Sequence, residues 1–124
     1  MGKTTALRGL IREQLQTVPG TTYHKAASAK ADYPYKTYVL ESINFPDSTR
    51  DDYDLVIDIW DRSPDQKTVE EIADQIEQLF NVANLPKPPI YPTFFRDGRN
   101  NLEDPDKDLQ HIQLHFIVQL YEED

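Results

Sequence analysis

The sequence contains no cysteine, and this absence excludes three kinds of chemistry at once. A disulfide framework, a thiol nucleophile and a thiolate zinc site all require the sulfur atom. No stretch approaches the roughly 18 consecutive apolar residues that span a bilayer, and no signal peptide precedes the first helical pattern. We therefore expect a soluble protein without a membrane anchor, compatible with a reducing cytoplasm.

Positive charge is also scarce, because the sequence has 13 basic and 22 acidic residues, which give a formal net charge of −9. A field of that sign repels phosphate backbones, so ordinary nucleic-acid binding is disfavoured. The 124 residues, 38% of them hydrophobic, are enough for one domain with a real core. We expect a single domain over residues 1–124.

The first residues resemble the end of a phosphate-binding loop, with Lys3-Thr4-Thr5 after Gly2. Such a loop needs an upstream glycine and a strand that leads into it, and neither is present. We expect Thr4 or Thr5 to cap a helix that ends at Pro19-Gly20. Its apolar stripe has helical spacing: Leu7, Leu10, Ile11, Leu15 and Val18.

Three strands are expected in the first half of the chain, at residues 21–25, at 35–45 and from Asp54 onward. The last of these, Asp54-Leu55-Val56-Ile57-Asp58-Ile59-Trp60-Asp61-Arg62, has the clearest alternation. One face carries Leu55, Ile57 and Ile59, which we assign to the core. The opposite face carries Asp54, Val56, Asp58 and Trp60. Residues 44–52 have the composition of a connecting loop.

The second helix is predicted to begin with Ser63 as its N-cap, Pro64 at the first helical position and Gln66 completing a capping box. Helically spaced apolar residues follow: Val69, Ile72, Ala73, Ile76, Leu79 and Phe80. The chain closes on a strand with five alternating apolar residues: Ile112, Leu114, Phe116, Val118 and Leu120.

An extended proline-rich loop or arm is expected at about residues 83–106, which contain five of the nine prolines. Part of it, from Tyr91 to Arg96, is expected to pair as a strand, with a turn over residues 97–101. The whole pattern predicts an α+β fold: a mostly antiparallel sheet of about four strands, with two amphipathic helices packed on one face.

No residue pattern indicates a catalytic, metal or cofactor site. His111 and His115 share one face of a strand, but roughly 13 Å separates positions four apart at about 3.3 Å per residue. Zinc–nitrogen bonds of about 2 Å do not bridge that distance. Asp54 and Asp58 have the same separation, and Asp61 points to the opposite face. We therefore expect no enzyme activity and no cofactor.

An acidic strand face that carries a tryptophan suits a protein contact with a charged rim. Aromatic residues elsewhere serve either the core or a contact. The candidate residues for a protein interface or for the wall of a channel are Tyr33, Tyr35, Asp54, Asp58, Trp60, Tyr91, Phe94, Phe95, Arg96 and Arg99.

The order of these segments resembles the tail completion, or tail terminator, proteins of long-tailed bacteriophages. The resemblance covers about residues 5–121. It rests on the first helix, on Tyr33-Pro34-Tyr35 leading into Lys36-Thr37-Tyr38-Val39-Leu40, on residues 55–63, on the helix from Val69 to Ile76, and on the final strand.

This resemblance implies a structural virion protein that forms a hexameric ring on the head-proximal end of the tail tube. The ring would terminate tube polymerisation and join the tail to the head connector or stopper, after assembly in the host cytoplasm. The expected partners are other copies of the chain, the tail tube protein and the connector. DNA would only pass through, and acids such as Asp54 and Asp58 would reduce its adhesion to the channel.

Two other functions stay open from the sequence. A generic cytoplasmic adaptor domain could use the same sheet for protein contacts. A small hydrolase would depend on Asp54, Asp58 and Asp61, but these lack an accompanying histidine, serine or lysine constellation.

Overall fold

The computed structural model describes residues 2–43, 51–81 and 83–122. Two helices and six strands follow one another along the chain. They are α1 (Lys3–Leu15), β1 (Thr21–His24), β2 (Tyr35–Ile43), β3 (Asp51–Arg62), α2 (Lys67–Phe80), β4 (Ala83–Asn84), β5 (Ile90–Asn101) and β6 (Leu109–Glu122).

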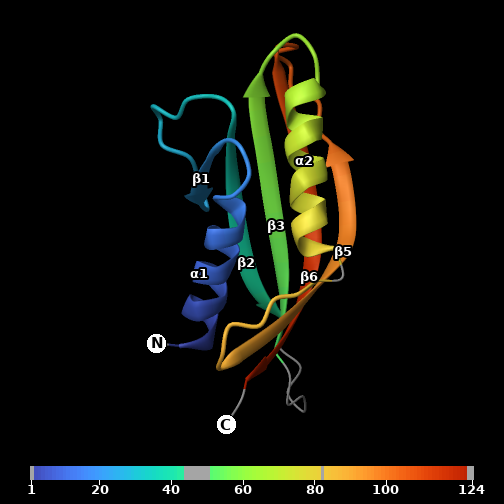
Figure 1. The fold of residues 1–124 in the computed structure, drawn as a ribbon. Coiled ribbons are helices and arrows are strands. Elements are labelled where there is room, and N and C mark those ends of the chain that lie inside the picture. The colour runs from blue at the N-terminus through green and yellow to red at the C-terminus, as the bar shows by residue number, and fades with distance from the viewer. Residues whose placement is uncertain (1, 44–50, 82, 123–124) are drawn as a thin grey trace.

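The strands form one sheet in the order β1-β2-β3-β6-β5-β4 (Figure 1). β1 runs parallel to β2, and all other neighbours are antiparallel. The α+β class is confirmed, but about four strands was too few, and the sheet is mixed. The sequence pattern missed the two-residue strand β4, which is too short to show an alternation.

Both helices lie on the same face of the sheet, α1 beside β1 and β2, and α2 over β3, β6 and β5 (Figure 1). Their apolar stripes face the inward residues of the strands, and this layer is the core. Its fully buried members include Leu7, Ile11, Leu15, Leu55, Ile57, Ile59, Ile76, Phe80, Phe94 and Leu114. The predicted two-layer packing is therefore confirmed.

The starts of both helices differ from the expectation. α1 has Gly2 at its N-cap and no side-chain cap, so neither Thr4 nor Thr5 caps it. α2 begins at Lys67 rather than near Ser63. The reason is local: the amides of Asp65 and Lys67 donate to Ser63 Oγ at 3.3 Å and to Asp65 Oδ1 at 3.0 Å, so these residues form turns, and the helix begins after Gln66 without a side-chain cap.

The proline-rich segment is more regular than an arm, because residues 90–101 form strand β5 along the whole of β6. The predicted turn over residues 97–101 is wrong. The register shifts between Arg96 and Gly98, which forms a β-bulge there, and the strand continues to Asn101. The predicted continuation of β2 to residue 45 lies outside the described residues.

Candidate functional site

The face of the sheet opposite the helices has no described element over it (Figure 1). Its side chains are half-buried by their neighbours in the sheet and half-exposed to the surroundings, in contrast to the fully buried residues between them. We call this the uncovered face. Its residues on the four long strands include Tyr35, Thr37, Val39, Glu41, Asp54, Val56, Asp58, Trp60, Thr93, Phe95, His111, Gln113, His115, Ile117 and Gln119.

A row of aromatic rings crosses one end of the uncovered face. Tyr33 and Tyr35 have ring centroids 5.3 Å apart, and Tyr35 stacks on Trp60 at 6.3 Å. Trp60 stacks on the His111 ring at 3.5 Å. Arg62 extends the row, with its guanidinium 5.4 Å from the centre of the Tyr33 ring. Burial is the main cause that raises the pKa of Tyr35 above its ordinary value, and the neighbouring Tyr33 and Tyr23 hydroxyls raise it further.

A chain of polar side chains runs from this row along β6. Asp58 Oδ1 accepts hydrogen bonds from His111 Nε2 at 2.6 Å and from Gln113 Nε2 at 3.0 Å. Gln113 Oε1 in turn accepts from His115 Nε2 at 2.8 Å. The two histidines thus bind different side-chain partners, His111 to Asp58 and His115 to Gln113. Asp58 is held by two donors, which fixes its orientation.

A shallow depression of about 430 Å³ lies over the aromatic row and Asp58, and Lys25, Thr37 and Gln113 contribute to its lining. The residues that a small acid-dependent hydrolase would need do not converge in it. Asp61 is buried on the helix-covered face, while Asp54 and Asp58 lie on the uncovered one. Among residues 2–43, 51–81 and 83–122, no three His, Asp or Glu side chains group as a metal site.

Two carboxylates face each other further along the uncovered face. Glu41 of β2 and Asp54 of β3 are direct partners in the register. Like charges directly opposite on a sheet destabilise it, so this pair is retained at a cost in stability. Neither Glu41 nor Asp54 forms an ion pair with a described residue, and their charge points away from the helices.

The structure brings most of the predicted interface residues to the uncovered face. Tyr35, Asp54, Asp58 and Trp60 lie on it, and Tyr33 stacks at its end. Tyr91 and Phe95 lie on the same face, on β5, opposite Tyr121 and Ile117. Tyr91 is 37% and Tyr121 47% exposed, so both members of this cross-strand pair are exposed aromatic side chains.

Phe94 is a correction, because it is fully buried and its ring packs 4.7 Å from Phe80 in the core. The alternation along β5 places it inward when Phe95 points outward. Arg96 and Arg99 also leave the uncovered face. Both reach α2, where Arg96 binds Glu77 at 2.7 Å and Arg99 binds Asp74 at 2.7 Å and Glu77 at 2.6 Å.

Sequence reasoning missed three residues that shape the uncovered face: Glu41, Gln113 and Tyr121. Each lies on a strand whose alternation was visible, so its face was predictable. The residues that lie beside them on the next strand were not predictable, because the register between β3 and β6 joins residues about fifty positions apart. A sequence alone does not fix which residues meet across such a pair.

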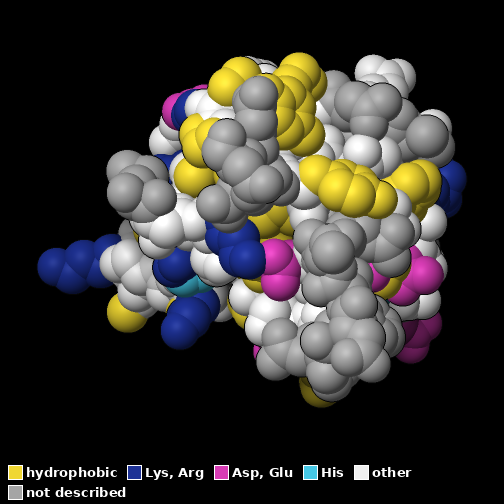
Figure 2. All heavy atoms as spheres, turned by 90° about the horizontal axis from the view of Figure 1, so that it is seen from below, with side chains coloured by type: hydrophobic (Ala, Val, Ile, Leu, Met, Phe, Trp, Pro, Cys, Tyr) yellow, Lys and Arg dark blue, Asp and Glu magenta, His cyan; other side chains and the backbone are white. Residues whose placement is uncertain are grey.

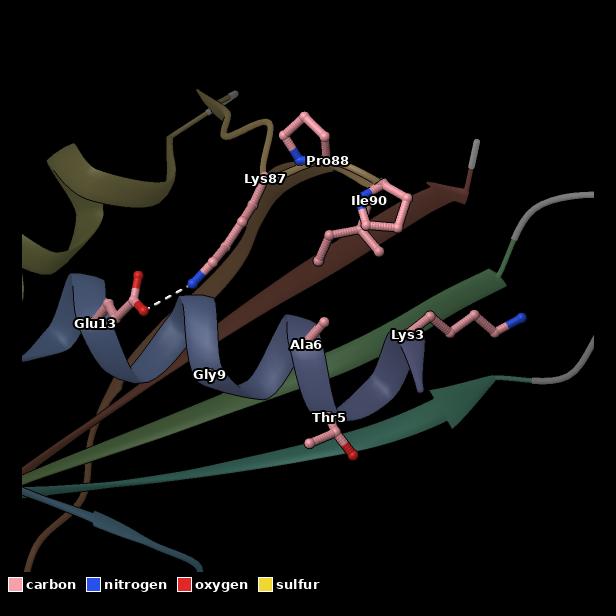
Figure 3. A pocket seen from close by; sticks show the side chains of 9 residues that line it. Lys3, Thr5, Ala6, Gly9, Glu13, Lys87, Pro88 and Ile90 are labelled. Atoms are coloured by element: carbon pink, nitrogen blue, oxygen red, sulfur yellow. Dashed lines mark hydrogen bonds and ion pairs between the residues drawn. The ribbon is translucent and has the colours of Figure 1, made fainter. Parts of the chain in front are cut away.

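A second hollow, of about 610 Å³, lies on the helix side between α1 and the turn that leads into β5 (Figure 3). Ala6 and Gly9 on the helix and Pro88 and Ile90 on the turn give it a mostly apolar lining. An ion pair between Lys87 and Glu13, 2.7 Å long, bridges its rim. The hollow has no carboxylate–histidine pair and no metal cluster among its lining residues, so we assign it to packing.

Two comparisons with known proteins each found a match, one by structure and one by sequence. Among solved structures, a chain of the virion of a native gene transfer agent particle matches with a TM-score of 0.65 at 12% sequence identity, over 90% of this chain and 84% of that chain. At that identity the likeness shows a shared fold. No curated protein sequence matches.

The sequence itself carries the family assignment, since the family model for tail completion protein gp17 matches residues 5–121. The matched span runs from α1 to the end of β6 and so includes both layers of the fold. The expected resemblance is confirmed: the chain belongs to the tail completion protein gp17 family and is a structural protein of phage tails.

Proposed function

We propose that six copies of this chain close into a ring on the head-proximal end of the tail tube. The ring ends tube polymerisation and presents the surface that binds the head connector. Family membership supports a place in the tail, and no acid cluster converges among the residues that the structure describes, which fits a protein that works by shape. No catalytic step and no cofactor are part of the proposal.

The observation that carries the proposal is the uncovered face. In a lone subunit, no described helix or strand forms a second layer on this side of the sheet, where Trp60, Phe95 and Ile117 are half-exposed. A ring in which this face turns inward gives it a defined environment, while the helices form the outer wall. Glu41 and Asp54 then add negative charge to the channel, so that DNA passes without adhering.

A closed ring needs two different patches on each subunit, one for each neighbour. The two ends of the sheet offer such patches. β1 pairs only with Tyr35–Tyr38, so the outer edge of β2 beyond Tyr38 has no strand partner among the described residues. At the other end, β4 and the segment after it pair with β5 only from Ile90 to Phe94, so the outer edge of β5 beyond Phe94 has no strand partner among the described residues. Both edges are thus open to another chain.

The contacts with other tail proteins belong to the two ends of the ring. The exposed Tyr91–Tyr121 pair lies at one end of the strands, where the chain also terminates (Figure 1). Amphipathic aromatic side chains of this kind are frequent contact residues. We assign this pair to the contact with the tube or the connector, in a virion particle assembled in the host cytoplasm.

A capping assay tests the proposed function. Purified tail tube protein is polymerised with and without the chain, and tube lengths and ends are examined by negative-stain electron microscopy. We expect shorter tubes with a ring at one end. Tubes of unchanged length whose ends carry no added density would contradict the proposal, and binding along the tube wall would favour a general adaptor instead.

A further inference from the structure

Charge is unevenly distributed along the chain. Five of the 13 basic residues lie between residues 3 and 30, where Glu13 is the only acid, and the remaining 21 acids lie after residue 31. The fold keeps this separation in space. Figure 2 shows Lys and Arg side chains gathered around a histidine at the left, the side on which α1 and β1 lie in Figure 1.

The basic surface consists of Arg8 and Arg12 on α1 with Lys25 after β1, and we call it the basic flank. Glu13 points to the other side of α1, towards Lys87, so the basic flank faces the β1 end of the sheet. Partial burial is the main cause that lowers the pKa of His24, and the positive charges of Arg8 and Lys25 lower it further. Both cations therefore lie near His24. Neither arginine forms an ion pair with a described residue.

The opposite end of the sheet carries an acidic surface on α2. Glu70 and Glu71 are exposed and have no ion-pair partner in the described chain. Asp74, one turn after Glu70, binds Arg99 of β5, so this side of α2 faces the β5 end of the sheet. We call Glu70, Glu71 and Asp74 the acidic flank.

We propose that the basic flank of one copy docks against the acidic flank of the next copy in the ring. This inference rests on the proposed function and names the contact that closes it. The two flanks lie in the same helical layer at opposite ends of the sheet, as neighbours related by rotation require. α1 has 13 residues and α2 has 14, so the two helices, both about 20 Å long, match in extent.

Opposite charges on the two flanks do more than attract. They fix which side of a subunit meets which, because a basic flank against a basic flank, or an acidic against an acidic, is repelled. The contact therefore specifies a head-to-tail ring rather than a two-fold dimer.

Two charge-reversal variants test the docking. In R8E/R12E both flanks are acidic, and in E70K/E71K the flank on α2 is basic, so each variant repels itself. In the capping assay we expect each alone to reduce the fraction of tubes with an end ring by more than about tenfold. Circular dichroism and thermal unfolding establish whether each variant is folded; Arg12, Glu70 and Glu71 are exposed and Arg8 is partly exposed, so we expect folded proteins.

A one-to-one mixture of the two variants is the decisive arm. In a ring of alternating variants every interface again joins opposite charges, so an even-numbered ring closes. We expect the mixture to restore end rings to near the wild-type fraction, with native mass spectrometry showing equal numbers of each variant. Rings formed by either variant alone, or a folded mixture that gives none, would overturn the docking.

The exposed pair E103K/K107E, in the turn between β5 and β6, is the matched control and should cap tubes like the wild type. The result with the unchanged chain distinguishes a failure of the proposed function from a failure of the flank contact. If the unchanged chain forms no ring, the proposed function fails. If the unchanged chain and both variants all form rings, only the flank contact fails.

Discussion

At the scale of single residues, Lys36 is the most unusual side chain. It is fully buried on the helix side of β2, without a carboxylate partner. Its ammonium donates to the carbonyls of Val18 at 3.1 Å and Pro19 at 3.2 Å, and also to that of Gly20. These carbonyls follow the C-terminus of α1, where a cation is favoured. Lys36 thus ties the end of α1 to the sheet.

Replacing Lys36 by methionine should destabilise the fold by about 1–3 kcal/mol, because three buried carbonyls lose their donor. Urea unfolding followed by circular dichroism measures the change. The exposed Lys30→Met is the control and should stay within about 0.5 kcal/mol of the wild type. A K36M protein as stable as the wild type would show that the carbonyls find other donors.

Burial also lowers the pKa of Lys36 from 10.5 to about 8. Between these values the unfolded chain binds more protons than the folded one, so the contribution of Lys36 to stability increases as the pH rises. We expect the stability difference between wild type and K36M to grow from pH 8 to pH 10. A difference that is constant over this range, or a Lys36 side-chain NMR titration with its midpoint near 10.5, would refute the assignment.

At the scale of elements, Glu77 joins α2 to β5. The carboxylate is largely buried and accepts from both Arg96 and Arg99, on either side of the bulge in β5. Substituting Glu77 by glutamine removes the charge and one acceptor, which should cost about 1–2 kcal/mol. Thermal unfolding of E77Q beside the exposed control E71Q measures this, and equal melting temperatures would count against the role.

The layers of the fold were predictable from periodicity, because Leu55, Ile57 and Ile59 alternate and Val69 to Phe80 follow a helical period. The boundaries were less predictable. Two local turns over residues 63–67 delay the start of α2 to Lys67, and the bulge at Arg96–Gly98 keeps a turn-like sequence inside a strand. The bulge depends on pairing with β6, which local sequence does not encode.

The candidate site was predictable only in part. The alternation of β3 placed Asp54, Asp58 and Trp60 on one face, as observed. The stack of Trp60 on His111 and the Glu41–Asp54 pair required the strand register, which joins distant segments. Phe94 was taken for a contact residue because a run of two aromatics gives no sign of which one points inward.

At the scale of the whole molecule, the carboxylates on the uncovered face predict an effect on DNA movement. Asp58 is held by His111 and Gln113, so Glu41 and Asp54 are the better pair to reverse. E41K/D54K should assemble rings but slow genome ejection, since the channel would attract phosphates. Ejection kinetics from purified virions test this, with E103K/D108K as the control. Unchanged ejection would place the uncovered face away from the channel.

The central claim is that this chain forms a ring at the head-proximal end of the tail with its uncovered face inward. Cryo-electron microscopy of the intact virion, focused on the junction between head and tail, tests it most directly. We predict six copies of the fold, with α1 and α2 outside and Trp60 and Asp54 towards the channel. Density for the chain at another place in the virion, or helices lining the channel, would contradict the account.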